Sequence, residues 1–278
     1  MTLPFIKLQG LGNCYIFVEA STVRKYPLPI LARKISDPAT GVGSDGLIVI
    51  DPLREPFPMR IYNRDGTEAE MCGNGLRQAA VYLHTARFPR RKRFQIAPPA
   101  GAMNTRIISG SNGAYRVKAD LGSPTFDAAD MGIKNRTGLA FDVPAYRTGN
   151  NWVKADCVSM GNPHAVVMVD NYDFDWLDMA RNIGTNKIFI KGTNVHFVQI
   201  YNSKRFAMRT YERGSGPTAA CGSGAAACLA VGVMRGLLGR EAVAEMPGGR
   251  LHVSWNMSSN VISQVGPAAI ICFGVYHG

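Results

Sequence analysis

The sequence lacks the patterns that mark secreted, membrane-spanning or metal-stabilised proteins. Its six cysteines form no Cys-x-x-Cys pair and no zinc-finger spacing. The longest apolar stretch, residues 225–233, is too short to span a bilayer. The N-terminus shows no basic segment followed by an apolar one, as a signal peptide would. These absences predict a cytoplasmic protein with free thiols, no membrane association and no metal site.

Composition favours a folded enzyme-sized chain. With 278 residues, the protein is long enough for two domains, and its 46% hydrophobic content excludes a mainly disordered chain. Three cysteines stand among apolar neighbours and are expected to pack as small hydrophobic residues, namely Cys157, Cys228 and Cys272.

A net charge of +11 raises the question of a nucleic-acid partner. Much of the excess lies in one basic run, made of Arg87, Arg90, Arg91, Lys92 and Arg93. No RNA-binding aromatic motif, zinc finger or helix-turn-helix accompanies the run, so we interpret it as a solvated loop between a helix and a strand. We therefore expect no nucleic-acid partner.

The chain contains one pattern twice. Residues 71–75 read Met-Cys-Gly-Asn-Gly and residues 220–224 read Ala-Cys-Gly-Ser-Gly, so Cys221 follows Cys72 by 149 positions. The same offset matches other residues along most of the chain, including Asn13 with Asn162, Gly43 with Gly192, Arg60 with Arg209, Tyr62 with Tyr211 and Pro98 with Pro247. One offset over this length indicates two copies of one domain.

Each copy predicts strands around a helix that follows the cysteine turn. The second of these helices, expected from about Gly224 to Leu238, is apolar on nearly every face and must be buried all round. The predicted fold is therefore α/β (α+β), with two pseudo-symmetric domains, each a curved mixed sheet wrapped around a central helix. We expect one domain at 1–121 with 265–278, and the other at 122–264.

A glycine motif at residues 41–46 fits G-x-G-x-x-G but not a dinucleotide site. Such a site requires a helix directly after the glycines, whereas residues 47–50 read as a strand. We interpret these glycines as a tight turn.

The repeated cysteines suggest acid–base chemistry. At a helix N-terminus, the exposed N–H groups and the macrodipole favour a thiolate. The amides of the residues that follow each cysteine can hold a carboxylate, namely Gly73, Asn74, Gly222 and Ser223. One thiolate could then remove a Cα proton while the other thiol delivers a proton to the opposite face, which inverts the stereocentre.

Several long motifs in fixed order resemble diaminopimelate epimerase over nearly the whole chain. They are residues 10–13 (GLGN), 62–75 (YNRDGTEAEMCGNG), 159–164 (SMGNPH), 211–216 (YERGSG), 220–224 (ACGSG) and 246–250 (MPGGR). The resemblance implies that family's two-domain fold, and inversion of a Cα centre of LL- or meso-diaminopimelate without pyridoxal phosphate, another cofactor or a metal. It places the activity in lysine and cell-wall biosynthesis.

The resemblance also assigns site residues. Cys72 and Cys221 would be the acid–base pair, and His164 and Glu212 would tune their protonation. The amino group and the distal amino-acid head would be held by Asn13, Asn63, Asn162, Asn194, Glu212 and Arg213. Considered alone, His164 is more often a satisfied core histidine than a catalyst.

Some positions depart from the family pattern, and these keep other substrates open. They are Cys14, Gln78, Gly192 and Pro217. The alternatives are a racemase of the same fold for another amino acid, such as histidine in metallophore biosynthesis, or an isomerase of the fold without racemase activity. The expected partner is in every case a small molecule, and the sequence leaves open whether the protein forms a homodimer.

Overall fold

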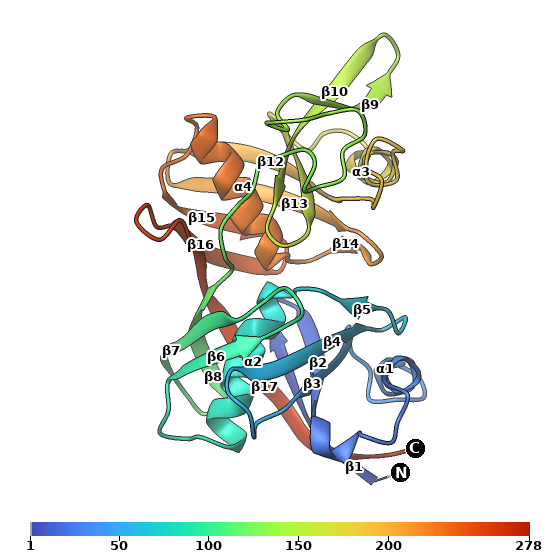
Figure 1. The fold of residues 1–278 in the computed structure, drawn as a ribbon, viewed down its shortest axis with the longest axis vertical. Coiled ribbons are helices and arrows are strands. Elements are labelled where there is room, and N and C mark those ends of the chain that lie inside the picture. The colour runs from blue at the N-terminus through green and yellow to red at the C-terminus, as the bar shows by residue number, and fades with distance from the viewer. Residues whose placement is uncertain (1) are drawn as a thin grey trace. The chain divides into compact units, whose positions relative to one another are not determined.

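The computed structural model describes residues 2–278, which form two compact units. Unit 1 comprises residues 2–120 and 265–278, and unit 2 comprises residues 121–264 (Figure 1). The chain passes between them at Asp120–Leu121 and again within the last strand, β17.

In unit 1 the strands form a closed ring. β1 pairs with β2, β2 with β3, β3 with β4, β4 with β6, β6 with β7, and β7 with β8. β17 closes the ring because it pairs with both β1 and β8. The short β5 adds to β4. Their bounds are β1 Thr2–Gly10, β2 Asn13–Glu19, β3 Gly46–Ile50, β4 Phe57–Asn63, β5 Glu68–Ala69, β6 Arg93–Ala97, β7 Met103–Ser111, β8 Ala114–Asp120 and β17 Ile262–His277.

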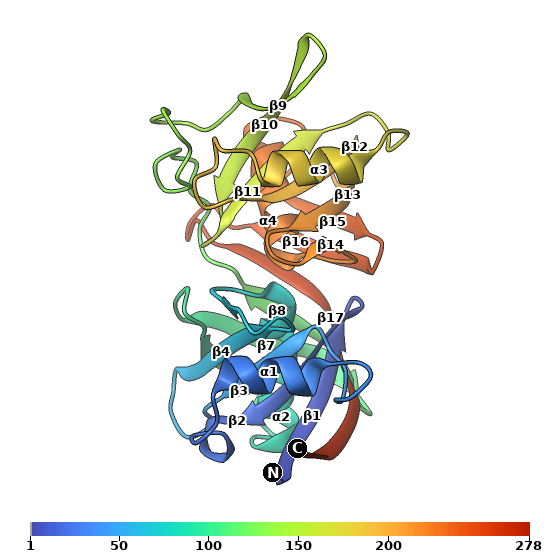
Figure 2. The ribbon, with the colours of Figure 1, turned by 90° about the vertical axis from the view of Figure 1, so that its right-hand side faces the viewer.

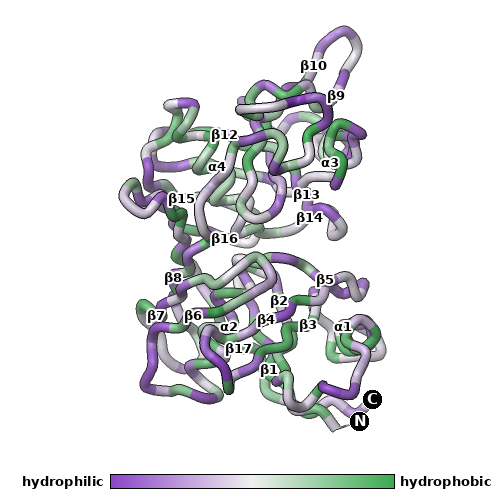
Figure 3. The backbone as a smooth tube through the Cα atoms, in the orientation of Figure 1, coloured by the Kyte–Doolittle hydropathy of each residue, from purple (hydrophilic) through white to green (hydrophobic). Residues whose placement is uncertain are grey.

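Helix α2 (Gly73–Ala86) lies inside this ring, where it contacts β1, β2, β6, β7 and β8. Its first 11 residues, 73–83, are all buried. Helix α1 (Leu28–Ser36) covers the outer face of the same sheet (Figure 2). Its apolar side packs on β1, β2 and β3 in a cluster that includes Leu31 and Ile35. β3 lies between the two helices and is hydrophobic along its length (Figure 3), as a strand buried on both faces must be.

Unit 2 repeats this arrangement. β10 pairs with β9 and β11, β11 with β12, β12 with β13, β13 with β14 and β15, and β15 with β16. The bounds are β9 Val143–Thr148, β10 Asn151–Ser159, β11 Pro163–Met168, β12 Asn194–Asn202, β13 Arg205–Glu212, β14 Gly216–Thr218, β15 Glu241–Met246 and β16 Gly249–Trp255. Each unit contains one parallel strand pair, β2–β3 in unit 1 and β11–β12 in unit 2. In each pair, the two strands are connected along the chain by a helix on the outer face of the sheet.

Helix α4 (Gly222–Met234) is the central helix of unit 2, and its first 11 residues are buried against β10, β11, β12, β15 and β16. Helix α3 (Trp176–Gly184) covers the outer face over a second apolar cluster. The prediction of a curved mixed sheet around a central helix is thus confirmed. A short helical turn, η1 (Ala20–Thr22), completes the elements.

Two local predictions need correction. Helix α4 ends at Met234 instead of Leu238, because Gly236 takes a positive φ of 72° and Leu238 folds back onto Gly232. Cys272 is exposed on β17, whereas Cys157 and Cys228 are buried as expected.

The basic run is an exposed connection between α2 and β6, as predicted: Arg87, Arg90, Lys92 and Arg93 are exposed and Arg91 is half-buried. Arg87 also forms an ion pair with Glu19, and Arg91 forms one with Glu55. These pairs fix the loop on the surface of unit 1.

Candidate active site

Cys72 caps the N-terminus of α2. Its backbone is extended, with φ −146° and ψ 108°, and its sulfur accepts a hydrogen bond from the Gly75 N–H at 3.2 Å. The sulfur therefore occupies the place that a Ser or Asp oxygen takes at an ordinary helix N-cap, beside the positive end of the helix.

Two polar side chains from β2 lie beside the Cys72 sulfur. It lies 3.6 Å from the Tyr15 hydroxyl and 4.0 Å from Oδ1 of Asn13. Asn74 donates to the same Asn13 oxygen at 3.4 Å, and Asp45 accepts from Nδ2 of Asn13 at 3.0 Å. The carboxylate of Asp45 thereby orients the Asn13 amide, so that its oxygen faces Cys72 and Asn74.

A fully buried arginine, Arg77, fixes the Asn74 side chain by a hydrogen bond. Arg77 donates to Oδ1 of Asn74 at 2.6 Å, to the Gly73 carbonyl at 3.3 Å and to the Pro267 carbonyl at 3.3 Å. Burial lowers the pKa of Arg77 to about 10, so the side chain is still a cation at neutral pH. Arg77 was not among the residues predicted from the sequence, although a charged residue within an otherwise apolar central helix was a usable signal.

Asn63 occupies a different turn. Its Nδ2 donates to the Thr67 hydroxyl at 3.0 Å, inside the connection between β4 and β5. Among residues 2–278, no described contact joins Asn63 to Cys72. Of the residues predicted in this half, the structure brings together Asn13, Cys72, Gly73 and Asn74, with Tyr15, Asp45 and Arg77 as additions.

Cys221 repeats the geometry of Cys72 at the start of α4. Its backbone angles are φ −128° and ψ 113°, and its sulfur accepts from the Gly224 N–H at 3.3 Å. The Ser223 hydroxyl lies 3.6 Å from the same sulfur. Gly222 lets the Gln264 side chain pack closely against the turn, because a Cβ at this residue would lie 2.6 Å from Oε1 of Gln264.

The electrostatic surroundings of Cys221 favour the protonated thiol. Burial, and next the negative charge of Glu212, raise the pKa of Cys221 well above its usual range. The Thr218 hydroxyl donates to Glu212 at 2.7 Å and fixes that carboxylate. The expected preference of a helix N-terminus for a thiolate is therefore outweighed at Cys221 by desolvation and by a neighbouring acid.

The remaining predicted residues of unit 2 form two small networks. Nε2 of His164 lies 2.8 Å from Oδ1 of Asn162. Asn194 donates to the Pro163 carbonyl at 2.9 Å and accepts from the Arg213 N–H at 3.0 Å. The Asn194 amide therefore ties the start of β11 to the end of β13. The Arg213 guanidinium donates to the Lys191 carbonyl at 3.0 Å.

His164 is fully buried, and burial lowers its pKa well below the usual range, assisted by His196 and by the charge of Arg213. Its other nitrogen, Nδ1, lies 2.8 Å from Nε2 of His196. His196 is a further residue of this network that the sequence did not predict, and its position in the middle of an apolar strand was the available signal.

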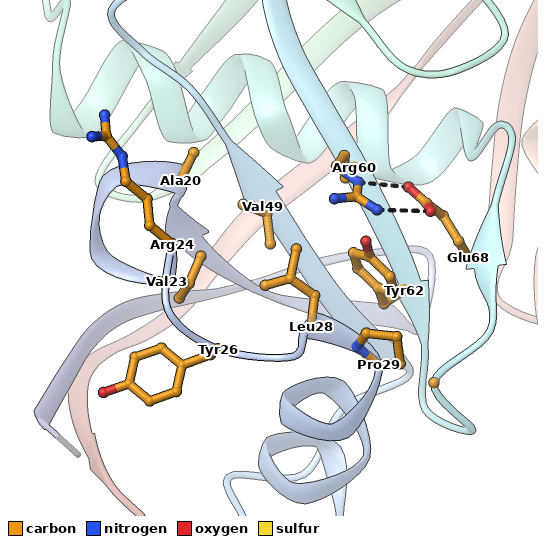
Figure 4. Close-up of a pocket in the computed structure, with 11 residues that line it drawn as sticks. Ala20, Val23, Arg24, Tyr26, Leu28, Pro29, Val49, Arg60, Tyr62 and Glu68 are labelled. Carbon is orange, nitrogen blue, oxygen red and sulfur yellow. Dashed lines mark hydrogen bonds and ion pairs between the residues drawn. The ribbon is translucent and has the colours of Figure 1, made fainter.

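A separate hollow of about 470 Å³ lies beside α1 on the outside of unit 1. Its lining includes Leu28, Val49 and Tyr62, and also Arg60 and Glu68, which form an ion pair at one side of it (Figure 4). None of the predicted site residues lines it, so the cysteine turn and this hollow are distinct features of the unit.

Among residues 2–278, no group of three or more His, Cys, Asp and Glu side chains could hold a metal ion. No helix among these residues is long and apolar enough to cross a membrane.

The fold is shared with several solved structures. A predicted epimerase from Pseudomonas aeruginosa superposes with a TM-score of 0.69 over 98% of both chains at 17% identity. A hydroxyproline epimerase from Agrobacterium vitis gives a TM-score of 0.69 over 99% of this chain and 90% of that chain, at 14% identity. A methylitaconate-delta-isomerase gives 0.64 over 99% and 95%, at 14% identity. The chain thus shares its fold with proteins described as epimerases and as an isomerase.

Sequence similarity narrows this class. Residues 5–126 and 156–271 match the family described as diaminopimelate epimerase. The chain is 37% identical to the diaminopimelate epimerase of Elusimicrobium minutum, with 99% of both proteins covered. It is 36% identical to that of Bacillus mycoides, with 98% of this chain and 96% of the relative covered. The chain belongs to the diaminopimelate epimerase family. Because epimerases are isomerases, the protein is an isomerase.

Proposed function

We propose that the protein interconverts LL- and meso-diaminopimelate by proton exchange at Cα, with Cys72 and Cys221 as the acid–base pair and without pyridoxal phosphate. The observation that carries the proposal is the equivalence of the two cysteines. Each caps the central helix of its unit, in the same backbone conformation, with its sulfur held by the N–H three residues later.

The two thiols start in different protonation environments. The raised pKa of Cys221 keeps its proton in place at neutral pH, so this residue is suited to act as the acid first. Cys72 then serves as the base in that direction, and the roles exchange in the reverse direction. Glu212, beside Cys221, can take over the thiol proton when Cys221 must act as the base.

The helix N-termini supply the carboxylate site. The N–H groups of Gly73, Asn74, Gly222 and Ser223 lie in the first turns of α2 and α4, where the macrodipoles favour an anion. N–H donors to a carboxylate bound there stabilise the negative charge that develops when the adjacent Cα proton is removed. The same contacts hold that Cα–H beside a sulfur. Asn13 and Asn162, each with its amide fixed by a neighbour, and Asn63, Asn194 and Arg213 are proposed to bind the rest of the substrate.

A cytoplasmic location follows from the same chemistry. All six cysteines are unpaired, and a mechanism that uses two thiols requires a compartment in which thiols stay reduced. The proposed partner is a small amino-acid substrate, without nucleic acid.

The test is isotope exchange. The protein is incubated in D₂O under reducing conditions with LL- and meso-diaminopimelate and with L-histidine, and loss of the Cα–H signal is followed by NMR. Exchange into diaminopimelate, absent in the Cys72→Ser/Cys221→Ser double variant, is the expected result. Exchange into histidine alone would assign a histidine racemase instead, and no exchange into any amino acid would reject racemase chemistry.

A further inference from the structure

Three buried polar side chains form a continuous line across the inner face of unit 2. His164 lies on β11, His196 on β12 and Thr210 on β13, and His196 faces Thr210 directly in the strand register. Both histidines are 0% exposed and Thr210 is 2% exposed. Nδ1 of His164 lies 2.8 Å from Nε2 of His196, and Nδ1 of His196 lies 3.1 Å from the Thr210 hydroxyl. The line ends at Asn162, whose Oδ1 lies 2.8 Å from Nε2 of His164.

The protons along this line follow from its donors and acceptors. A neutral imidazole has one donor and one acceptor nitrogen, and both rings are neutral because burial opposes their charged forms. The oxygen of Asn162 can only accept, so Nε2 of His164 carries the proton and its Nδ1 accepts. His196 must then donate from Nε2 and accept at Nδ1, and Thr210 donates from its hydroxyl.

This order decides what Asn162 offers to a ligand. Because its oxygen faces His164, its Nδ2 amide group faces away, and no residue among 2–278 is recorded as accepting from it. Asn162 is half-buried, so this donor remains within reach of a bound molecule. An N–H donor binds a carboxylate and repels an ammonium group.

His196 also touches the turn that holds Cys221. A Cβ on Gly224 would lie 2.3 Å from Cε1 of His196, so the imidazole occupies the space above this glycine. The N–H of Gly224 is the donor to the Cys221 sulfur. One ring therefore supports both the thiol turn and the Asn162 amide.

We propose that His196 is a positioning residue: it fixes the tautomer of His164, and thereby aims the N–H donors of Asn162 at a carboxylate of the substrate. The assignment rests on the proposed function for its substrate, but the proton order itself does not. His164 is in this arrangement a support for Asn162 and not a proton carrier.

The first experiment reads the proton order without any turnover. In ¹⁵N-histidine-labelled protein at neutral pH, long-range ¹H–¹⁵N spectra should show His164 and His196 both protonated at Nε2 and unprotonated at Nδ1. Protonation of both rings at Nδ1 would reverse the line, turn the Asn162 oxygen outward and overturn the proposal. This result stands whether or not diaminopimelate is the substrate.

The second experiment compares His196→Gln with His196→Leu. The glutamine amide can still donate to Nδ1 of His164, whereas leucine fills the space without a donor. We expect KM for diaminopimelate to rise about tenfold in His196→Leu, the equivalent of one lost hydrogen bond, while kcat changes less. His196→Gln should restore KM to within about threefold, and His252→Gln, an exposed histidine on β16, serves as the control.

Equal KM values in the leucine and glutamine variants would contradict the positioning role. If His196→Leu does not fold, the KM of the glutamine variant and the tautomers in the wild-type spectra still test the positioning role. If the wild-type protein shows the expected tautomers but does not act on diaminopimelate, the proposed function is rejected and the proton order stands.

Discussion

At the scale of single residues, the two cysteine turns have the same backbone but different neighbours. Cys72 lies beside Tyr15 and Asn13 and interacts electrostatically with the Arg77 cation, whereas Cys221 is buried beside the carboxylate of Glu212. The shared backbone provides an N–H donor to each sulfur, and the different neighbours give the two thiols different electrostatic surroundings. A few residues around each turn therefore distinguish the two thiols, and at Cys221 burial and Glu212 raise the pKa.

Replacement of either sulfur by oxygen tests the acid–base assignment. Cys72→Ser and Cys221→Ser should each lower kcat by roughly 10²–10⁴-fold, because a serine hydroxyl is a poor base at neutral pH. The rate of stereoinversion measures the effect, and the unfolding midpoint checks that each variant is folded. Cys272→Ser, at an exposed cysteine, should leave the rate unchanged. Near-normal turnover in either single variant at the helix caps would refute the two-thiol mechanism.

The equivalent glycines of the two turns should respond differently to alanine. At Gly224 an added Cβ would meet the His196 ring at 2.3 Å, whereas at Gly75 it would meet the mobile end of Ile48 at 3.0 Å. We expect Gly224→Ala to lower the free energy of unfolding by about 3 kcal/mol. Gly75→Ala should cost about 1 kcal/mol or less, because alanine also favours the helix. Urea denaturation of both variants measures the difference, and equal losses would show that His196 does not fill the space above Gly224.

At the scale of elements, the outer face of unit 1 carries a row of like charges. Arg93 on β6 lies directly opposite Arg106 on β7, and Arg106 lies directly opposite Lys118 on β8. Among residues 2–278, no ion pair is recorded for these three side chains. Cations that face each other across strands destabilise a sheet, so this row contributes strain to the closed ring.

Removal of the central charge should therefore stabilise the protein. Arg106→Thr is expected to raise the free energy of unfolding by about 0.5 kcal/mol at low salt, since it relieves two repulsive pairs and places a β-branched residue in a strand. The gain should shrink at high salt as screening increases. Arg116→Thr is the matched control, because Arg116 faces Ser109 and not another cation. An equal gain in the control would attribute the effect to strand propensity alone.

At the scale of the whole molecule, the buried histidine pair links stability to pH. Burial lowers the pKa of His196 to about 3 and that of His164 well below its ordinary range, whereas both titrate near 6.5 when unfolded. Below pH about 6.5 the unfolded chain binds two protons that the folded chain does not. The stabilisation is therefore complete above pH 6.5 and is lost as the pH falls.

We expect the free energy of unfolding to decline between pH 6.5 and 5 with a slope that approaches about 2.7 kcal/mol per pH unit. Carboxylates with lowered pKa values, such as Asp65 and Asp142, change the free energy of unfolding only at more acidic pH, where they become protonated. Urea unfolding across this pH range measures the slope, and His196→Gln should roughly halve it. A pH-independent stability in this window would show that the histidines are solvated.

Much of this molecule is determined by its sequence. The duplication, the sheet around a central helix and the two cysteine-capped helices follow from the 149-residue offset, from strand and helix periodicity and from one apolar helix. Such features depend on residues close in the chain or on a repeated pattern, so a single sequence contains them.

Other features of the site depend on contacts between elements that are distant in the chain, and these appear only once the chain is folded. Arg77, His196 and Asp45 act on site residues through hydrogen bonds with partners from other strands or helices, and no local pattern indicates those contacts. The protonation of Cys221 was likewise decided by its burial and by Glu212 and not by its helix N-terminus alone. Local sequence specifies which groups are present, but a pKa and a tautomer depend on solvent exclusion and on neighbours that folding brings together.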